Sequence, residues 1–307
     1  MRVIVAGLGV QGYKRRKHAG KDYIASVDPV NKEAEYHNIS DVPLNSYDAV
    51  LACIPDEPKV ELIKYALANS KHVLLEKPLW AAQDDDIIQL EQLAIKNKVV
   101  CYTAYNHRFE PHFVQMRDLI ASGKLGNIYS CRMFYGNGTA RLVRDSEWRD
   151  QGGGVLPDLG SHLLDTCRFW FGTELGEFRL IAAHNFENRA PDHIIISSET
   201  NQPRIELEMT LCMWRNHFTC DILAEQGTAH IESLCKWGPT TFSHRERVLP
   251  SGRPPETRIT LVQEDPTWEA EYNHFKQLVK LGTITDLSND QWLQTNLRRL
   301  NRSININ

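Results

Sequence analysis

The chain has 307 residues, a formal net charge of −4 and a pI of about 6.3. Hydrophobic residues make up 42% and charged residues 24%, which excludes a disordered chain and a fibrous repeat. Basic residues are scattered, and no apolar stretch approaches the roughly 20 residues of a membrane helix, so neither a nucleic-acid partner nor a membrane span is expected. The length exceeds what one core usually covers and predicts two domains.

Alternating strands and helices predict an N-terminal domain over residues 1–105. Short apolar runs indicate buried strands at 2–6, 23–27, 48–54, 72–75 and 99–103. Amphipathic patterns indicate helices at 59–69 and 83–96. This alternation is typical of a parallel βαβ sheet, and hence of an α/β Rossmann domain.

The rhythm changes after residue 105 and predicts a second domain over residues 106–307. Helices are expected at 113–122, 157–171 and 268–280, and strands at 127–135, 178–184, 193–199, 204–212 and 217–224, with a hairpin connection at 201–203. Consecutive strands predict an α+β domain with an open-faced, mainly antiparallel sheet. Its uncovered face should associate with other subunits, giving a homodimer or homotetramer.

Cysteine usage bears on the cellular compartment. The seven cysteines form no CxxC pair and show no metal-ligand spacing, so we expect reduced core residues and no metal site. The first residues run into a strand pattern without the apolar core of a signal peptide. A soluble, cytoplasmic protein is therefore expected.

A glycine-rich turn follows the first strand and predicts a dinucleotide site. Gly7 permits a tight turn, Gly9 allows close backbone approach to a pyrophosphate, and Gly12 allows close packing of helix and strand. Asp28, at the end of the second strand, would bind the adenosine ribose and repel a 2′-phosphate, favouring NAD over NADP. The alternative is a tight turn beside a surface carboxylate.

Lys77 is the first catalytic candidate. It lies in Glu76-Lys77-Pro78, directly after the predicted strand at 72–75. Ligands of doubly wound sheets gather at the carboxyl ends of the strands, so Lys77 should point toward the nicotinamide. A solvated lysine is the alternative.

Three polar residues of the predicted helix at 157–171 form a second candidate group. Asp158, His162 and Asp165 are spaced four and three apart, which predicts one shared face. His162 could exchange a proton with a carbinol near neutral pH, and Asp158 could orient its ring. The alternative is a histidine that caps or bridges inside a domain interface.

Four motifs together resemble the glucose-fructose oxidoreductase and inositol dehydrogenase (Gfo/Idh/MocA) family. They are the glycine turn at 7–12, Glu76-Lys77-Pro78, the Tyr-Asn-His-Arg-Phe run at 105–109 and the Asp158-to-Asp165 helix, in this order along nearly the whole chain. The first Rossmann helix, between Gly12 and Tyr23, is shorter than is common in the family. The segment 54–58 lacks a histidine frequent in relatives.

The resemblance implies roles for individual residues. The catalytic group would be Lys77, Asp158 and His162. The cofactor would be bound by Gly7, Gly9, Val10, Gln11, Gly12, Asp28, Ile54, Pro55, Glu76 and Lys77. The substrate would be bound by Lys77, Tyr105, Asn106, Arg108, Arg144, Asp158 and His162.

The expected function is hydride transfer between NAD(H) and a carbinol or ketone carbon of a sugar, sugar acid, nucleotide sugar or polyol. Within the segment 136–149, Arg141, Arg144 and Arg149 could bind a phosphate or carboxylate, or could simply be solvated. The alternatives are a non-catalytic NAD-binding regulator and a reductase of a non-sugar carbonyl, imine or tetrapyrrole.

Overall fold

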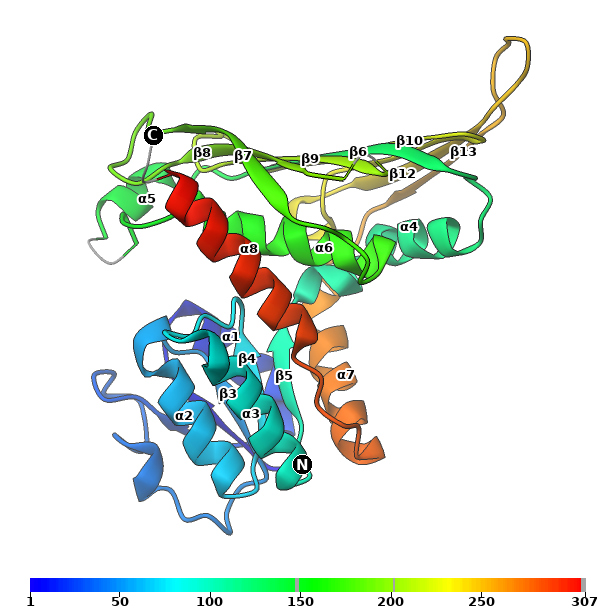
Figure 1. Ribbon diagram of the computed structural model, residues 1–307. Helices are drawn as coiled ribbons and strands as arrows, with labels where there is room; N and C mark the ends of the chain where they lie inside the picture. Colours follow the sequence, from blue (N-terminus) through cyan, green and yellow to red (C-terminus); the bar gives the residue numbers. More distant parts are fainter. Residues whose placement is uncertain (147–148, 201, 305–307) are drawn as a thin grey trace. The chain divides into compact units, whose positions relative to one another are not determined.

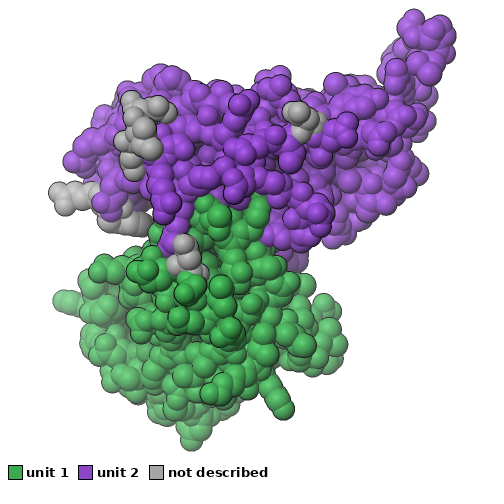
Figure 2. Space-filling model, in the orientation of Figure 1, with its two compact units in different colours: residues 1–106, 267–295 green, residues 107–266, 296–307 purple. Residues whose placement is uncertain are grey.

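The computed structural model describes residues 1–146, 149–200 and 202–304. The chain divides into two compact units, distinguished by colour in Figure 2. Unit 1 comprises Met1–Asn106 and Thr267–Thr295, and unit 2 comprises His107–Pro266 and Asn296–Asn307. Each unit has its own sheet.

Unit 1 is built on a five-stranded parallel sheet of order β2-β1-β3-β4-β5. Its strands are β1 (Val3–Ala6), β2 (Tyr23–Val27), β3 (Ala49–Ala52), β4 (His72–Glu76) and β5 (Cys101–Ala104). Its helices are α1 (Val10–Ala19), α2 (Asp56–Ala68), α3 (Asp84–Lys96) and α7 (Thr267–Leu281), and α8 (Ser288–Ile304) supplies residues to both units. The predicted Rossmann architecture is confirmed.

Strand residues of unit 1 alternate between two apolar cores, one on each face of the sheet. Ile4 and Ala6 of β1 pack in the core that includes residues of α2 and α3. Val3 and Val5, one residue out of phase, pack in the core with Tyr272 and Phe275 of α7. Both faces are therefore covered, as a parallel sheet requires.

The two units differ from the predicted ranges 1–105 and 106–307 because the segment that contains α7 returns to unit 1. The helix itself was predicted at 268–280, but its segment Thr267–Thr295 belongs to unit 1. The physical reason is the burial of Tyr272 and Phe275 against the Rossmann strands. Amphipathic spacing indicates that such a helix has a buried face but not which sheet receives it.

Unit 2 contains an eight-stranded sheet of order β13-β12-β11-β10-β6-β9-β8-β7. The strands are β6 (Ile128–Gly136), β7 (Phe178–His184), β8 (His193–Ser198), β9 (Arg204–Thr210), β10 (His217–Ala224), β11 (Gly227–Glu232), β12 (Thr240–Glu246) and β13 (Glu256–Leu261). Only the pairing of β6 with β9 is parallel among the described strands of this sheet. The predicted, mainly antiparallel sheet is confirmed, and β8 pairs antiparallel with β9; Asn201 of their predicted connection lies outside the described residues.

Helices α4 (Pro111–Ala121) and α6 (Ser161–Phe171) cover one face of this sheet (Figure 1). Strand β10 shows the resulting alternation, because Phe218, Cys220 and Ile222 are buried while His217 and Asp221 are exposed. No helix covers the opposite face in the part of the chain that the structure describes (Figure 1). Leu223 of β10, out of phase with Cys220 and Ile222, lies on that face and is exposed, and Tyr129 of β6 and Ile181 of β7 are further exposed apolar residues of the sheet.

Several elements lie outside the predicted set. They are α5 (Ala140–Arg144), α8 and strands β11 to β13. Strand β13 is exposed along nearly its whole length at the sheet edge, so it lacks the apolar alternation that predicts strands. None of the described helices is long and apolar enough to cross a membrane.

Candidate active site

The glycine turn joins β1 to α1, and its three glycines meet different surroundings. Gly7 has φ +90°, and a Cβ there would lie 2.5 Å from the Cys53 carbonyl oxygen. A Cβ at Gly12 would lie 1.9 Å from the Gly7 carbonyl oxygen. A Cβ at Gly9, in contrast, would meet no atom within 4 Å. The fold itself thus requires Gly7 and Gly12, whereas Gly9 leaves open space beside the N-terminus of α1.

Asp28 braces the same turn. Its carboxylate accepts hydrogen bonds from the backbone N–H groups of Leu8 (2.7 Å), Val30 (2.9 Å) and Asn31 (2.8 Å). Burial raises the pKa of this carboxyl, but the three backbone donors outweigh burial and leave the pKa below its ordinary value. Asp28 is therefore a negative charge at neutral pH, bonded to Leu8, the residue that precedes Gly9.

Ile54 and Pro55 follow β3 at the same edge of the sheet. Strands β1 and β3 are parallel neighbours with Ala6 opposite Ala52, so the segments after them emerge together. Pro55 immediately precedes α2, and Val10 and Gln11 are exposed in the first turn of α1. The predicted cofactor-binding positions of unit 1 thus lie at the carboxyl edge of one sheet.

Two buried cations hold the loop that carries Lys77. Arg15 donates to the Glu76 carboxylate at 2.6 Å, and Lys59 Nζ donates to the backbone carbonyls of Glu76 (3.3 Å) and Pro78 (3.2 Å). Lys59 Nζ also pairs with Asp56 at 2.5 Å. Lys77 lies between the two carbonyls that Lys59 holds, so its backbone has little freedom to move.

Arg15 pairs with two carboxylates of unit 1, and no sequence motif identified it as part of the site. Its guanidinium also pairs with Glu271 of α7 at 2.7 Å and lies 4.4 Å from the ring centroid of Trp268. Its side chain is 1% exposed and that of Glu271 is fully buried. A sequence signal did exist, because Arg15 falls in phase with the buried positions Gly12 and Ala19 of α1.

His162 lies in α6 of unit 2, within an aromatic cluster. Its ring stacks on the His107 ring with centroids 3.9 Å apart and planes inclined by 17°. Tyr135 lies beside both rings, at 5.4 Å from His107 and 6.2 Å from His162. Phe113 contacts the edge of His107 at 5.7 Å. The stack fixes the plane of the predicted catalytic imidazole, a role for His107 that spacing did not reveal.

The helix carrying His162 is less regular than predicted. It begins as a turn of π-helix at Leu156–Gly160, and α6 starts only at Ser161. Asp158, in the π turn, is half exposed and lies 3.8 Å from Arg149, whereas Asp165 is buried and binds the Arg108 guanidinium at 2.5 and 2.9 Å. The two carboxylates predicted on one face therefore have different surroundings.

The remaining substrate-binding candidates have these positions. In unit 1, the buried Tyr105 hydroxyl donates to Asp290 at 3.1 Å, and Asn106 donates to Thr267 at 2.9 Å. In unit 2, Arg144 is exposed at the end of α5, and Arg141 lies 3.5 Å from Glu187. Residues 147 and 148 of the predicted specificity segment lie outside the described residues.

The candidates thus form two groups, one in each unit. Unit 1 contains the glycine turn with Asp28 bonded to it, and also Lys77, whereas unit 2 brings together His162, His107 and Tyr135. That Lys77 and His162 act on one substrate oxygen stays a prediction.

Comparison with known families matches both units. The model described as "Oxidoreductase family, NAD-binding Rossmann fold" matches residues 2–105. The model described as "GFO/IDH/MocA C-terminal domain" matches residues 113–230. Together the two models span most of the chain.

Individual relatives are similar over shorter stretches. An uncharacterized oxidoreductase of Schizosaccharomyces pombe is 33% identical over 133 residues, covering 42% of this chain and 35% of the relative. Inositol 2-dehydrogenase 3 of Saccharopolyspora erythraea is 22% identical over 207 residues, covering 66% of this chain and 60% of the relative. Less than two thirds of either relative is matched.

Among solved structures, levoglucosan dehydrogenase in complex with NADH superimposes with a TM-score of 0.84 at 15% identity. The match covers 100% of this chain and 97% of that one. At this identity the likeness establishes the fold.

Proposed function

Because the chain belongs to the Gfo/Idh/MocA family of oxidoreductases, we propose that it transfers a hydride between NAD(H) and a CH–OH carbon of a sugar-like or polyol substrate. One observation carries the proposal: the carboxyl edge of the Rossmann sheet combines open space at Gly9, the charged Asp28 and a braced Lys77. The groups that would bind a dinucleotide and the proposed reactive lysine thus follow the carboxyl ends of strands of one parallel sheet, where doubly wound sheets bind ligands.

The residues of unit 1 fit a dinucleotide. The backbone of Gly9, Val10 and Gln11 would receive the pyrophosphate at the N-terminus of α1, where N–H groups and the helix dipole favour anions. Asp28 would accept hydrogen bonds from the ribose hydroxyls, and its charge would repel a 2′-phosphate, so we propose NAD rather than NADP. The bound cofactor would accept or donate the hydride.

Lys77, His162 and Asp158 would act on the substrate. Lys77 would donate a hydrogen bond to the reacting oxygen, and His162 would take the hydroxyl proton during oxidation and return it during reduction. The stacked His107 ring would hold the plane of His162, and Asp158 would orient the imidazole. The roles of Lys77 and His162 require that both reach the same oxygen.

A sugar-like substrate is supported by the relatives. Inositol 2-dehydrogenase and levoglucosan dehydrogenase carry names of polyol and sugar substrates. Exposed Arg144 would add affinity for a substrate carboxylate or phosphate. We also propose substrate-binding roles for Tyr105, Asn106 and Arg108. Their side chains now bond to Asp290, Thr267 and Asp165, respectively. Each would therefore contact the substrate either through its backbone or after its side chain exchanges this hydrogen bond for one to the substrate.

A substrate screen tests the proposal. The protein is incubated with NAD⁺ and a panel of polyols, free sugars, sugar acids and nucleotide sugars, and in reverse with NADH and the matching ketones, while NADH absorbance is followed. We expect turnover with at least one member of the panel and less with NADP⁺. If NAD binds by calorimetry but no CH–OH compound or ketone is turned over, the dehydrogenase assignment fails and a regulatory NAD-binding role replaces it.

We also propose that the uncovered sheet face of unit 2 joins subunits into a dimer or tetramer. Leu223 is 51% exposed on that face, and the exposed Tyr129 and Ile181 belong to the same sheet. Light scattering at micromolar concentration should give at least twice the monomer mass, and Leu223→Lys should lower it. A monomeric wild-type protein would contradict this assembly.

A further inference from the structure

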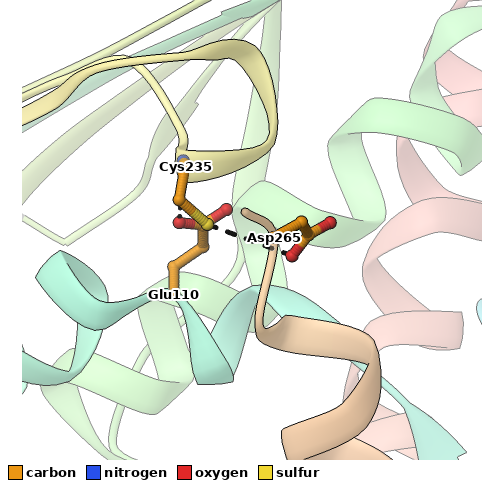
Figure 3. A group of neighbouring side chains, drawn as sticks. All are labelled: Glu110, Cys235 and Asp265. Carbon is orange, nitrogen blue, oxygen red and sulfur yellow. Dashed lines mark hydrogen bonds between the residues drawn. The ribbon is translucent and has the colours of Figure 1, made fainter. Parts of the chain in front are cut away.

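Three side chains from distant parts of the unit 2 sequence meet in a group that contains neither His107 nor His162 (Figure 3). Glu110 lies just before α4, Cys235 lies in the short turn between β11 and β12, and Asp265 follows β13. One potential ligand atom from each lies within 4.8 Å of the other two. Figure 3 shows the Glu110 carboxylate and the Asp265 carboxylate on either side of the Cys235 sulfur.

Glu110 supplies an independent sign that a ligand is missing from this group. The residue is 2% exposed, and its Oε2 accepts the backbone N–H of Cys235 at 3.2 Å. Its Oε1 is buried and has no hydrogen-bond partner among the described residues. A buried carboxylate oxygen without a partner is costly, and a metal ion is one group that would satisfy it.

We propose that Glu110, Cys235 and Asp265 bind one divalent cation of the zinc type. Thiolate and carboxylate are both zinc ligands, and three protein ligands leave a fourth position for water. Zinc–sulfur and zinc–oxygen bonds of about 2.3 and 2.1 Å require the ligand atoms to approach one another by about 1 Å, which small side-chain rotations supply. The Sγ of Cys235 and Oδ1 of Asp265 are 3.9 Å apart, close to the spacing on a tetrahedral ion.

The charges around the group suit a divalent cation. Two carboxylates and a thiolate carry three negative charges, and the neighbouring Lys236 carries one positive charge. A divalent cation would bring the net charge of these four side chains to zero.

A thiol binds a metal ion as the thiolate, so Cys235 would lose its proton when the ion binds. Sequence spacing could not reveal this site, because its ligands are distributed over residues 110 to 265.

Metal titration of the chelator-treated full chain tests the proposal. Zn²⁺ should bind with a stoichiometry of one and release at least about one proton, from the Cys235 thiol, measured by calorimetry in buffers of different ionisation enthalpy. Co²⁺ at the same site should produce a sulfur-to-cobalt charge-transfer band in the near ultraviolet. Both measurements use the unsubstituted protein, so they do not depend on the folding of a variant. Absence of the band, or zinc binding without proton release, would overturn the proposal.

Variants locate the ion. Cys235→Ser should remove the charge-transfer band and weaken zinc at least about 100-fold, and Glu110→Gln should weaken it at least about 10-fold. Cys212→Ser is the matched control, because that thiol also interacts with a carboxylate, Asp192, but lies outside the group. A band that survives Cys235→Ser, or disappears in Cys212→Ser, would place the cation elsewhere and refute the site.

Discussion

Replacing Arg15 by methionine should destabilise unit 1 strongly while preserving much of the side-chain volume. Arg15 is 1% exposed and pairs with Glu76, which is 15% exposed, and with Glu271, which is fully buried. Removing one partner of a buried ion pair costs about 3–5 kcal/mol, because the remaining charge is left in a medium of low polarity. The lost contact with Trp268 adds about 0.5–2 kcal/mol, so a total of about 5 kcal/mol is expected.

Thermal and urea unfolding of Arg15→Met against the unsubstituted chain measures this cost. For a domain of this size, about 5 kcal/mol corresponds to a decrease in Tm of roughly 15 °C. The double variant Arg15→Met/Glu271→Gln should recover part of the loss, since it removes the stranded buried charge. Lys17→Met, at an exposed position of the same helix, should change stability by less than about 0.5 kcal/mol. A loss below about 1 kcal/mol for Arg15→Met, or no recovery in the double variant, would refute the reasoning.

Three further substitutions probe other parts of the account. Asp28→Ala should reduce the preference for NAD over NADP at least about 10-fold by calorimetry, and an unchanged ratio would remove Asp28 from cofactor selection. His107→Ala should lower kcat about 10- to 100-fold while His107→Phe, which keeps a stacked ring, should lower it less; equal losses would exclude a positioning role. Burial lowers the pKa of His72 in the folded chain, and its neutral Nδ1 accepts the Val100 N–H. Neutral His72 therefore stabilises the folded state fully above pH 6.5, and this stabilisation is lost as the pH falls from 6.5 toward the folded-state pKa. The decrease in unfolding free energy from pH 7 to 5.5 should accordingly be smaller in His72→Gln, and an identical pH profile would contradict this assignment.

Local sequence patterns predicted most of the strands and helices of unit 1. Its strands are short apolar runs flanked by polar turns, and β2 (Tyr23–Val27) begins and ends at the predicted residues.

Two buried cations could also have been found by the same reasoning. Lys59 lies in phase with the buried residues Ile63 and Leu67 of α2, as Arg15 lies in phase with Ala19 of α1. A cation in the apolar stripe of a helix indicates a buried polar partner.

The partners of those cations could not be predicted, because they depend on tertiary structure. Glu271 is 256 residues from Arg15, and no local pattern links the two. The π turn before α6 likewise changes the surroundings of Asp158 relative to a regular helix, although the residues around it have helical spacing. The stack of His107 on His162 joins two segments of unit 2 that are separated in sequence by α4, β6 and α5.

The proposed mechanism requires that Lys77 and His162 act on one substrate oxygen while the hydride passes between the adjacent carbon and NAD(H). The most direct measurement is steady-state turnover of Lys77→Ala and His162→Ala with a substrate identified in the screen, alongside NAD affinity by calorimetry. Each variant should lose about 10²- to 10⁴-fold in kcat while NAD affinity changes little, and the double variant should lose much less than the product of the two. Turnover that stays unchanged in both variants, with NAD still bound, would contradict the account.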